Sequence, residues 1–262
     1  MSNDTKPTGS AWTLSAGKVN SATAKLIDEL GDKGAEVITK IDEDPTFRRR
    51  IANLAKSGGY LPTTDQERAK RIMGTNYVGP DAAMEHLGVQ YTERELATLA
   101  VVPFSEAVLK DCAKTHVLVA GAPLSILEIR ERAQAKGKLF YSTSDAWYNA
   151  EKFATDEKVN MQWYLIRKDA VANSFSKNWN DQQALLTPEE TTPCACEVVY
   201  VTILTFLVTG IRLFEKYYVR CSDVSTRGYR VYVGRFDAGG LRVNDNWVAY
   251  RYDGLGLASR RK

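Results

Sequence analysis

The sequence predicts an α+β fold in which a helical N-terminal portion precedes a domain of short antiparallel strands and long loops. Up to residue 112, apolar residues recur at spacings of three and four, which is typical of amphipathic helices. From residue 113 onward they gather in short runs, separated by stretches rich in Ser, Asn and Gly that are typical of turns and loops. We therefore expect a disordered polar N-terminus at 1–14, a helical region at 15–112 and a strand-containing domain at 113–262.

The first helices follow from spacing and from their end signals. Residues 15–40 show the apolar spacing of an amphipathic helix, with an interruption near Gly31–Gly34. A second helix is predicted over Pro45–Lys56, because Pro favours the first helical turn and the run Ser57–Gly59 follows as a stop.

Three shorter helices are predicted next. The run Thr63–Glu67 is a cap-like start for a helix over Arg68–Met73, and Pro80–Leu87 forms another helix. In the third, Thr92–Leu99, Glu95 follows three residues after the capping Thr and completes a capping box.

Strand-like runs begin after residue 115. The apolar stretches His116–Ala120, Leu139–Tyr141 and Gln162–Arg167 are predicted strands, with a helix over Leu124–Arg132 between the first two.

The last part of the chain opens with a helix predicted from Cys194 to Leu207, after Thr192-Pro193. Tyr217–Arg220 and Arg230–Val233 are then predicted as strands joined by a turn. A final strand is expected over Gly256–Arg260.

Composition and charge restrict the function classes. With 262 residues, 44% hydrophobic and 26% charged, the chain can bury a sizeable core. A net charge of +3 gives no support to dedicated nucleic-acid binding. The most apolar stretch, Val198–Ile211, is shorter than the roughly 20 residues that cross a bilayer, and no secretory signal is visible. We therefore expect a cytoplasmic protein without a membrane span, with a phage particle or surface display as alternatives.

Sequence signals for catalysis and metal binding are missing. We find no glycine-rich phosphate loop, no nucleophile elbow and no zinc-protease helix. The spacing of Cys194 and Cys196 does not match common zinc knuckles. The alternation of a predicted strand places either Arg220 or Cys221 inward, and we expect Cys221 there because an arginine is costly to bury. We expect no enzymatic activity, no cofactor and no metal.

The C-terminal segment, about 235–262, interleaves two kinds of position. One kind is apolar or glycine and would form a scaffold: Phe236, Gly239, Gly240, Leu241, Val243, Trp247, Leu255, Gly256 and Leu257. The other kind shares no common chemistry and comprises the variable positions: Arg242, Asn244, Asp245, Asn246, Val248, Ala249, Tyr250, Tyr252 and Asp253. A surface rich in Tyr, Asn and Gly is typical of a paratope, in which Tyr gives rigid contact area and Asn adapts its hydrogen bonds. The pattern therefore predicts a ligand-binding surface near the C-terminus.

Three stretches carry a resemblance to a known family: Leu213–Asp223, Arg230–Asp237 and Gly240–Arg260. They resemble the variable proteins of diversity-generating retroelements, whose C-terminal domain is similar to a C-type lectin fold close to the formylglycine-generating enzymes. In that family an error-prone reverse transcriptase rewrites adenines from a template copy into the 3′ end of the gene. Altered Asn codons then encode Tyr, Asp, Ser, Gly, Arg, Ala, Val and others, and the variable positions resemble such outcomes. The resemblance implies that Trp247 and Leu255 belong to the unaltered frame. From the residues alone, two roles stay open for Trp247: an anchor of the loop, or part of the lining of a ligand site.

The resemblance implies a diversified protein that binds an unknown protein or cell-surface ligand on a C-type-lectin-like scaffold. Two alternatives stay open: an enzyme of the formylglycine-generating type, and a phage receptor-binding or structural protein. The enzymes of that type need a pair of cysteines in their late region, where this chain has only Cys221. The oligomeric state also stays open at this point.

Overall fold

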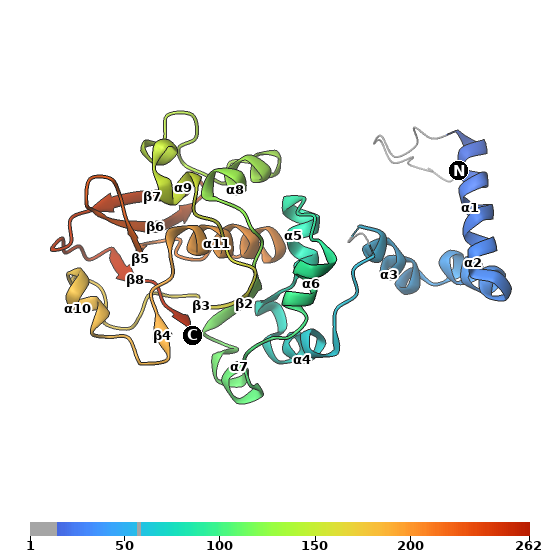
Figure 1. Cartoon of the computed structure of the whole chain (residues 1–262), viewed down its shortest axis with the longest axis horizontal. Coiled ribbons are helices and arrows are strands. Elements are labelled where there is room, and N and C mark those ends of the chain that lie inside the picture. The colour runs from blue at the N-terminus through green and yellow to red at the C-terminus, as the bar shows by residue number, and fades with distance from the viewer. Residues whose placement is uncertain (1–14, 57–58) are drawn as a thin grey trace, which may run out of the picture. The chain divides into compact units, whose positions relative to one another are not determined.

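The computed structural model describes residues 15–56 and 59–262, so the segment 1–14, for which disorder is predicted, lies outside the described residues. The chain divides into two compact units, one ending at Gly59 and the other running from Tyr60 to Lys262 (Figure 1). Helices and short strands are both present, so the α+β class is confirmed. The predicted boundary at 112/113 falls inside the second unit.

Residues 60–112 belong to the second unit because their helices pack against the strands that follow. Leu99 and Leu109 lie in one buried cluster with Leu118 and Trp163. The Trp163 indole also donates a hydrogen bond to the carbonyl of Leu99, at 3.0 Å. Helical spacing alone does not reveal such long-range packing.

The first unit contains three helices: α1 (Ala16–Leu30), α2 (Gly34–Glu43) and α3 (Pro45–Lys56). Their bounds follow the sequence prediction, including the interruption between α1 and α2. The carboxylate of Asp44 accepts hydrogen bonds from the backbone N–H groups of Thr46 and Phe47, at 2.8 and 3.0 Å, and so caps α3.

The second unit begins with four short helices: α4 (Thr64–Met73), α5 (Pro80–Leu87), α6 (Glu93–Leu99) and α7 (Glu106–Cys112). The capping box predicted for Thr92 and Glu95 starts α6. A second capping box, formed by Thr63 and Gln66, starts α4, which therefore begins at Thr64 and not at Arg68 as predicted. Gly88 ends α5 in the left-handed conformation, with φ of 62°.

A five-stranded sheet with the order β1-β2-β3-β9-β4 follows. Its strands are β1 (Tyr77–Val78), β2 (His116–Ala120), β3 (Trp163–Arg167), β4 (Glu190–Thr191) and β9 (Arg260–Arg261). Only the β1–β2 pair is parallel. The end of the chain therefore returns to pair with β3 and β4.

A four-stranded sheet with the order β7-β6-β5-β8 carries the C-terminal segment. Its strands are β5 (Tyr218–Val224), β6 (Arg230–Asp237), β7 (Gly240–Asn246) and β8 (Leu255–Leu257). β6 pairs antiparallel with β5 and with β7, whereas β8 runs parallel to β5.

Two strand predictions need correction, and one strand was not predicted. The stretch Leu139–Tyr141 forms only an isolated bridge, between Phe140 and Leu241. The single final strand predicted over Gly256–Arg260 is replaced by β8 and β9, one in each sheet. β7 was not predicted at all, since its end is polar and turn-like in sequence. The turn into β7 needs Gly240, whose φ is 102° and whose Cβ, if present, would lie 2.5 Å from the Phe140 backbone.

The helix α11 (Ala195–Thr209), predicted from the apolar run, forms the centre of the core. It contacts strands of both sheets and the helices α5, α8 (Ile126–Ala133) and α9 (Lys152–Thr155), so it is apolar on all sides. Among the described residues, no helix is both long and apolar enough to cross a membrane.

Candidate binding surface

In the four-stranded sheet, side chains point alternately to the core and to the outer face, and this separates the scaffold positions from most of the variable positions. Along β7, Leu241 and Val243 face the core, whereas Arg242, Asn244 and Asn246 lie on the partly exposed side. Three residues of the predicted scaffold, Phe236, Leu241 and Leu255, are buried to 1% exposure or less. The outer face of this sheet, together with the loop 247–254 between β7 and β8, is called the recognition surface from here on.

Two tyrosines of the neighbouring strands extend the recognition surface. Tyr218 of β5 and Tyr232 of β6 meet edge to face, with ring centroids 5.0 Å apart. The side-chain amide of Asn244 lies 3.4 Å from the hydroxyl of Tyr218. Both tyrosines lie outside the predicted site, although their alternation with the buried Val219 and Val231 would have identified them.

The loop 247–254 carries a row of aromatic rings. The Trp247 and Tyr250 rings lie 5.1 Å apart, and Tyr250 stacks on Tyr252 at 6.3 Å. Of the two roles that the sequence leaves open for Trp247, the exposure of its ring favours the second, a place in the ligand site: Trp247 is 51% exposed, because the chain leaves the sheet at that point. Trp247 is therefore a contact residue of the recognition surface.

The backbone of this loop is held by groups from outside the C-terminal segment. The carbonyl of Val248 accepts from the N–H of Trp179, and the carbonyl of Tyr252 accepts from that of Ser176, both at 3.1 Å. The carbonyl of Tyr250, between them, accepts from the guanidinium of Arg220. Because these bonds use only carbonyl groups of the loop, they do not depend on the identity of its side chains.

Arg220 is the largest fully buried side chain of the described residues. Its Nη1 donates to the carbonyl of Lys177 and to Oε1 of Gln182, at 3.0 and 2.9 Å. We expected Cys221 to be buried and Arg220 to be exposed; the expectation for Arg220 is wrong, because both side chains are buried. Cys221 faces α11, and Arg220 is covered on the opposite face by the recognition loop and α10 (Trp179–Gln183). Burial lowers the pKa of Arg220 to about 10, so it stays charged at neutral pH.

Gln182 joins Arg220 in one network below the loop. Its amide Nε2 donates to the carbonyls of Ser174 and Leu255, at 2.8 and 3.1 Å, while its Oε1 accepts from Arg220. The network connects α10 to β5 and to the start of β8 without using any variable position as a side-chain partner.

Asp245 departs from the other variable positions. Its side chain is only 4% exposed, because it lies on the same side of β7 as Val243. Its carboxylate accepts a 2.6 Å hydrogen bond from Ser225 and pairs with Arg227. Asp245 therefore supports the sheet instead of forming part of the recognition surface.

This placement predicts unequal tolerance of two aspartates. Asp245→Ala should lower the free energy of unfolding by about 1–3 kcal/mol, because it removes both contacts and leaves Ser225 without its acceptor. The exposed Asp253→Ala should stay within about 0.5 kcal/mol of wild type. Chemical denaturation of both variants checks this, and equal losses would contradict the assignment.

A cavity of about 110 Å³ adjoins the edge of the recognition surface at β7. Tyr141, Trp147, Arg242 and Asn244 contribute to its lining. The Trp147 indole donates to the carbonyl of Val243 at 2.8 Å, and the Arg242 guanidinium lies 4.4 Å from the centre of the Tyr141 ring. Two variable positions therefore shape this cavity together with fixed aromatic rings from elsewhere in the chain.

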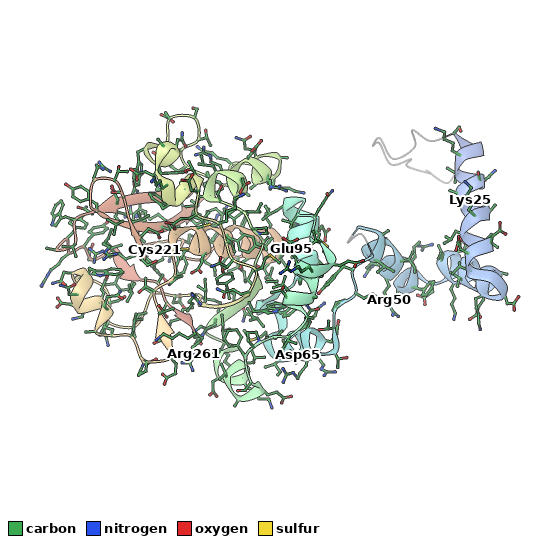
Figure 2. The ribbon with its side chains drawn as sticks, in the orientation of Figure 1. Lys25, Arg50, Asp65, Glu95, Cys221 and Arg261 are labelled. Carbon is green, nitrogen blue, oxygen red and sulfur yellow. The ribbon has the colours of Figure 1, made fainter. Side chains whose placement is uncertain are left out.

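The cysteines show no sign of a reactive thiol. Cys221, labelled in Figure 2, is fully buried, and burial raises the pKa of its thiol well above the ordinary range. All four cysteines are free. Within the part of the chain that the structure describes, no group of three or more His, Cys, Asp or Glu side chains is arranged to hold a metal ion.

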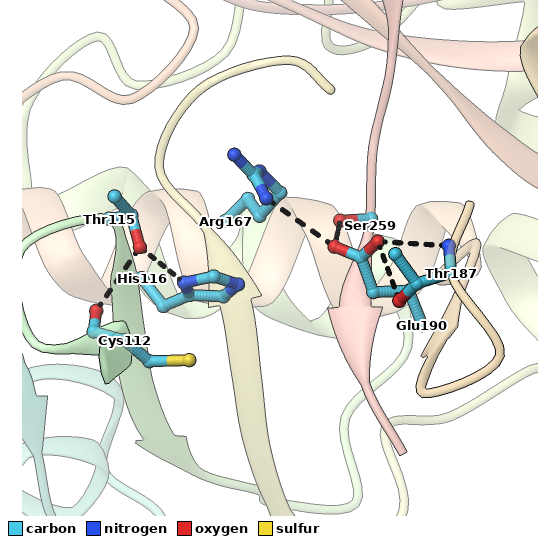
Figure 3. Close-up of polar contacts among 7 residues, drawn as sticks. All are labelled: Cys112, Thr115, His116, Arg167, Thr187, Glu190 and Ser259. Carbon is cyan, nitrogen blue, oxygen red and sulfur yellow. Dashed lines mark hydrogen bonds and ion pairs between the residues drawn. The ribbon is translucent and has the colours of Figure 1, made fainter. Parts of the chain in front are cut away.

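A second polar cluster lies at the five-stranded sheet, apart from the recognition surface (Figure 3). Glu190 accepts a 3.1 Å hydrogen bond from Ser259, just before β9, and pairs with Arg167 of β3 at 3.4 Å. On the other side of β3, the buried His116 shares a 2.8 Å hydrogen bond with Thr115 through Nδ1, while its Nε2 has no hydrogen-bond partner among the described residues. Burial, together with Arg167, lowers the pKa of His116 to about 4. The cluster fastens the C-terminal strand and holds a neutral imidazole.

Because His116 is buried as a neutral imidazole, we expect the free energy of unfolding to fall in acid. The unfolded chain binds the proton with a pKa near 6.5 and the folded chain only near 4, so stability is complete above pH 6.5 and falls as the pH drops toward 4. At pH 4.5 this amounts to about 2–3 kcal/mol. The variant His116→Gln should lose that much less than wild type between pH 7 and 4.5 in denaturation experiments.

Because wild type and His116→Gln share all other titrating groups, the difference between their pH profiles reports on His116 alone. Asp223, for example, acts in the opposite direction, since burial raises its pKa to about 7. Identical pH profiles for wild type and His116→Gln would show that His116 does not titrate as the structure requires.

The recognition surface thus combines tyrosines of β5 and β6, outward residues of β7 and an aromatic loop held by buried polar groups. Comparison of the chain with protein-family models, with curated proteins and with solved structures finds no match. The residues and their contacts are therefore the basis on which a function is assigned.

Proposed function

We propose that this chain is a diversified ligand-binding protein, the variable protein of a diversity-generating retroelement, and that the recognition surface binds its ligand. The variable positions would be rewritten at the level of the gene, while the sheet and the buried network keep the fold. Two sheets of short, mainly antiparallel strands with long loops between them suit a C-type-lectin-like scaffold for this surface.

The way in which the recognition loop is held carries this proposal. Diversification requires that side chains can change while the backbone stays in place, because random changes at buried positions commonly cost 1–3 kcal/mol. Here Trp179, Ser176 and Arg220 bind loop carbonyls, which every amino acid provides. The side chains of the loop therefore need not contribute to its conformation.

The chemistry of the surface supports recognition of a macromolecule. Tyr218, Tyr232, Tyr250, Tyr252 and Trp247 present rings on one side of the sheet and its adjoining loop. Rings of this kind give a large contact area with few rotatable bonds, so little conformational entropy is lost on binding. A protein or another cell-surface molecule suits such a surface better than a small substrate, because the cavity at its β7 edge holds only about 110 Å³.

A pair of display libraries tests the proposal. The first library randomises the variable positions with exposed or half-exposed side chains: Arg242, Asn244, Asn246, Val248, Ala249, Tyr250, Tyr252 and Asp253. The control library randomises eight buried positions of the same sheet and its neighbourhood: Val219, Val231, Val233, Phe236, Leu241, Val243, Leu255 and Leu257.

Resistance to protease on the cell surface reports the folded fraction, and panning on immobilised proteins reports binding. We expect most members of the first library to fold and some to bind unrelated target proteins, whereas the control library mostly fails to fold. If both libraries lose folding alike, or if the folded first library yields no binders, the proposal is wrong.

A further inference from the structure

The N-terminal unit has almost no interior of its own. Of its described side chains and glycines, only Gly34 is buried. The apolar side chains of Leu26, Ile27 and Ile51 are 46%, 37% and 37% exposed. Contacts link α1 to α2 and α2 to α3, so the three helices form a chain of neighbours instead of a closed bundle.

Helices of this length need tertiary packing to persist. Isolated helices shorter than about 12–15 residues are marginal in water, and α2 has 10 residues. A unit this small seldom buries enough apolar surface to be very stable alone, and natural small domains often add disulfides, metals or oligomerisation. Val37, Ile38 and Ile41 give α2 an apolar side, and all three are only half-buried, so this side is incompletely covered within the unit.

Charge in this unit is divided along the sequence. Residues 28–44 contain seven acidic and two basic residues, whereas residues 45–56 contain Arg48, Arg49, Arg50 and Lys56 and no acid. Within the described part of the unit, the ion pairs join Glu36 to Lys33 and Lys40, both inside the acidic stretch. Arg48 donates to the carbonyls of Ile41 and Asp42. Arg49 and Arg50 are also exposed on α3, and Arg50 is labelled in Figure 2.

We propose that the N-terminal unit is a self-association module whose partner is a second copy of this chain. The acidic stretch 28–44 of one copy would lie against the basic α3 of the other, and a two-fold axis would repeat the contact in reverse. Leu26, Ile27 and Ile51 would then be covered between the copies. A self-complementary charge pattern is what such an isologous interface requires.

The same charge pattern argues against anionic membranes and nucleic acids as the partner of this unit, although both can bind a basic helix. Anionic lipid and nucleic acid both attract α3, but they repel the acidic stretch joined to it directly before Pro45. A second copy satisfies both halves at once. Self-association does not depend on the proposed function, although it would give each assembly two recognition surfaces and so raise avidity for a repeated ligand.

Sedimentation velocity and light scattering of the full chain test the module. We expect about twice the chain mass of 29.2 kDa at micromolar concentration, with dissociation favoured by high salt. The apolar variant Leu26→Asp/Ile51→Asp and the charge variant Arg49→Glu/Arg50→Glu should each raise the dissociation constant by roughly tenfold or more. A control, Arg94→Glu/Lys114→Glu in the second unit, should leave the mass unchanged.

A charge-swap mixture gives the decisive readout. The chain with Arg49→Glu/Arg50→Glu and a chain with Asp42→Lys/Glu43→Lys should each be monomeric alone and should associate when mixed. A monomeric wild type at all concentrations overturns the proposal. So does a monomer whose N-terminal variants lower the unfolding temperature of the second unit, since that shows docking within one chain, or a monomer that binds anionic vesicles or DNA through α3.

Discussion

Arg220→Ala is expected to lower the free energy of unfolding by about 3–5 kcal/mol. Removal of the guanidinium leaves three acceptors without their donor: the buried Oε1 of Gln182 and the partly buried carbonyls of Lys177 and Tyr250. Each unsatisfied buried acceptor costs about 1–3 kcal/mol. The loop 247–254 should also lose protection, because one of the bonds that hold its backbone is gone.

Chemical denaturation and amide hydrogen exchange of the loop measure the two effects. Arg220→Lys should be nearly as damaging, since one ammonium group cannot reach acceptors on both sides as the planar guanidinium does. Arg251→Ala is the matched control. It removes an arginine of the loop 247–254 that is 61% exposed and that, among the described residues, pairs with Asp181 alone, so it should cost less than about 1 kcal/mol. Similar losses for Arg220→Ala and Arg251→Ala would refute the role given to Arg220.

Phe236→Ala should be the second severe change, with a loss of about 3–5 kcal/mol. Phe236 is fully buried, and its ring meets that of Phe206 on α11 at 5.1 Å. Trp247→Ala removes a larger ring from the same segment but should cost only about 1 kcal/mol or less, because the indole is half exposed.

Thermal or chemical unfolding of the two variants separates a scaffold residue from a contact residue. Tyr250→Ser should be measured as a second variant of the exposed loop, and we expect only a small loss in its free energy of unfolding. If Trp247→Ala were as damaging as Phe236→Ala, the loop would be part of the core. The distinction between buried scaffold residues and exposed contact residues would then be wrong.

Helices were predictable where local signals agree. Pro45 and the run Ser57–Gly59 predict the bounds of α3, and Thr92 with Glu95 predicts the start of α6, because caps act over a few neighbouring residues. The apolar run that became α11 was also predicted, since a helix that contacts structure on all sides is apolar throughout.

The candidate site was predictable only in part. Leu241 and Leu255 could be assigned to the scaffold from the pattern, but β7 was missed because Asn244-Asp245-Asn246 is typical of a turn. Pairing with β6 along its whole length overrides that local preference. The sequence left the place of Trp247 open, because a large ring in a loop can either be buried as an anchor or be exposed; its exposure follows from the chain leaving the sheet at that point.

The support beneath the loop could not be predicted from the sequence. Arg220 is buried although a charged side chain is expected to be exposed, and its acceptors come from positions far away along the chain. The bonds from Ser176 and Trp179 to the loop are equally long-range backbone contacts. Only the tertiary structure brings these groups together.

Sequencing the 3′ end of this gene from many cells of one population, together with the neighbouring DNA, tests the central claim most directly. The proposal predicts an adjacent reverse-transcriptase gene and a near-copy of the 3′ end, with differences at adenines and confined to codons of the variable positions. Codons for Phe236, Leu241 and Leu255 should be constant. A 3′ end that is uniform with no such copy nearby, or that varies as often at these scaffold codons as at Tyr250 and Tyr252, would contradict diversification of the recognition surface.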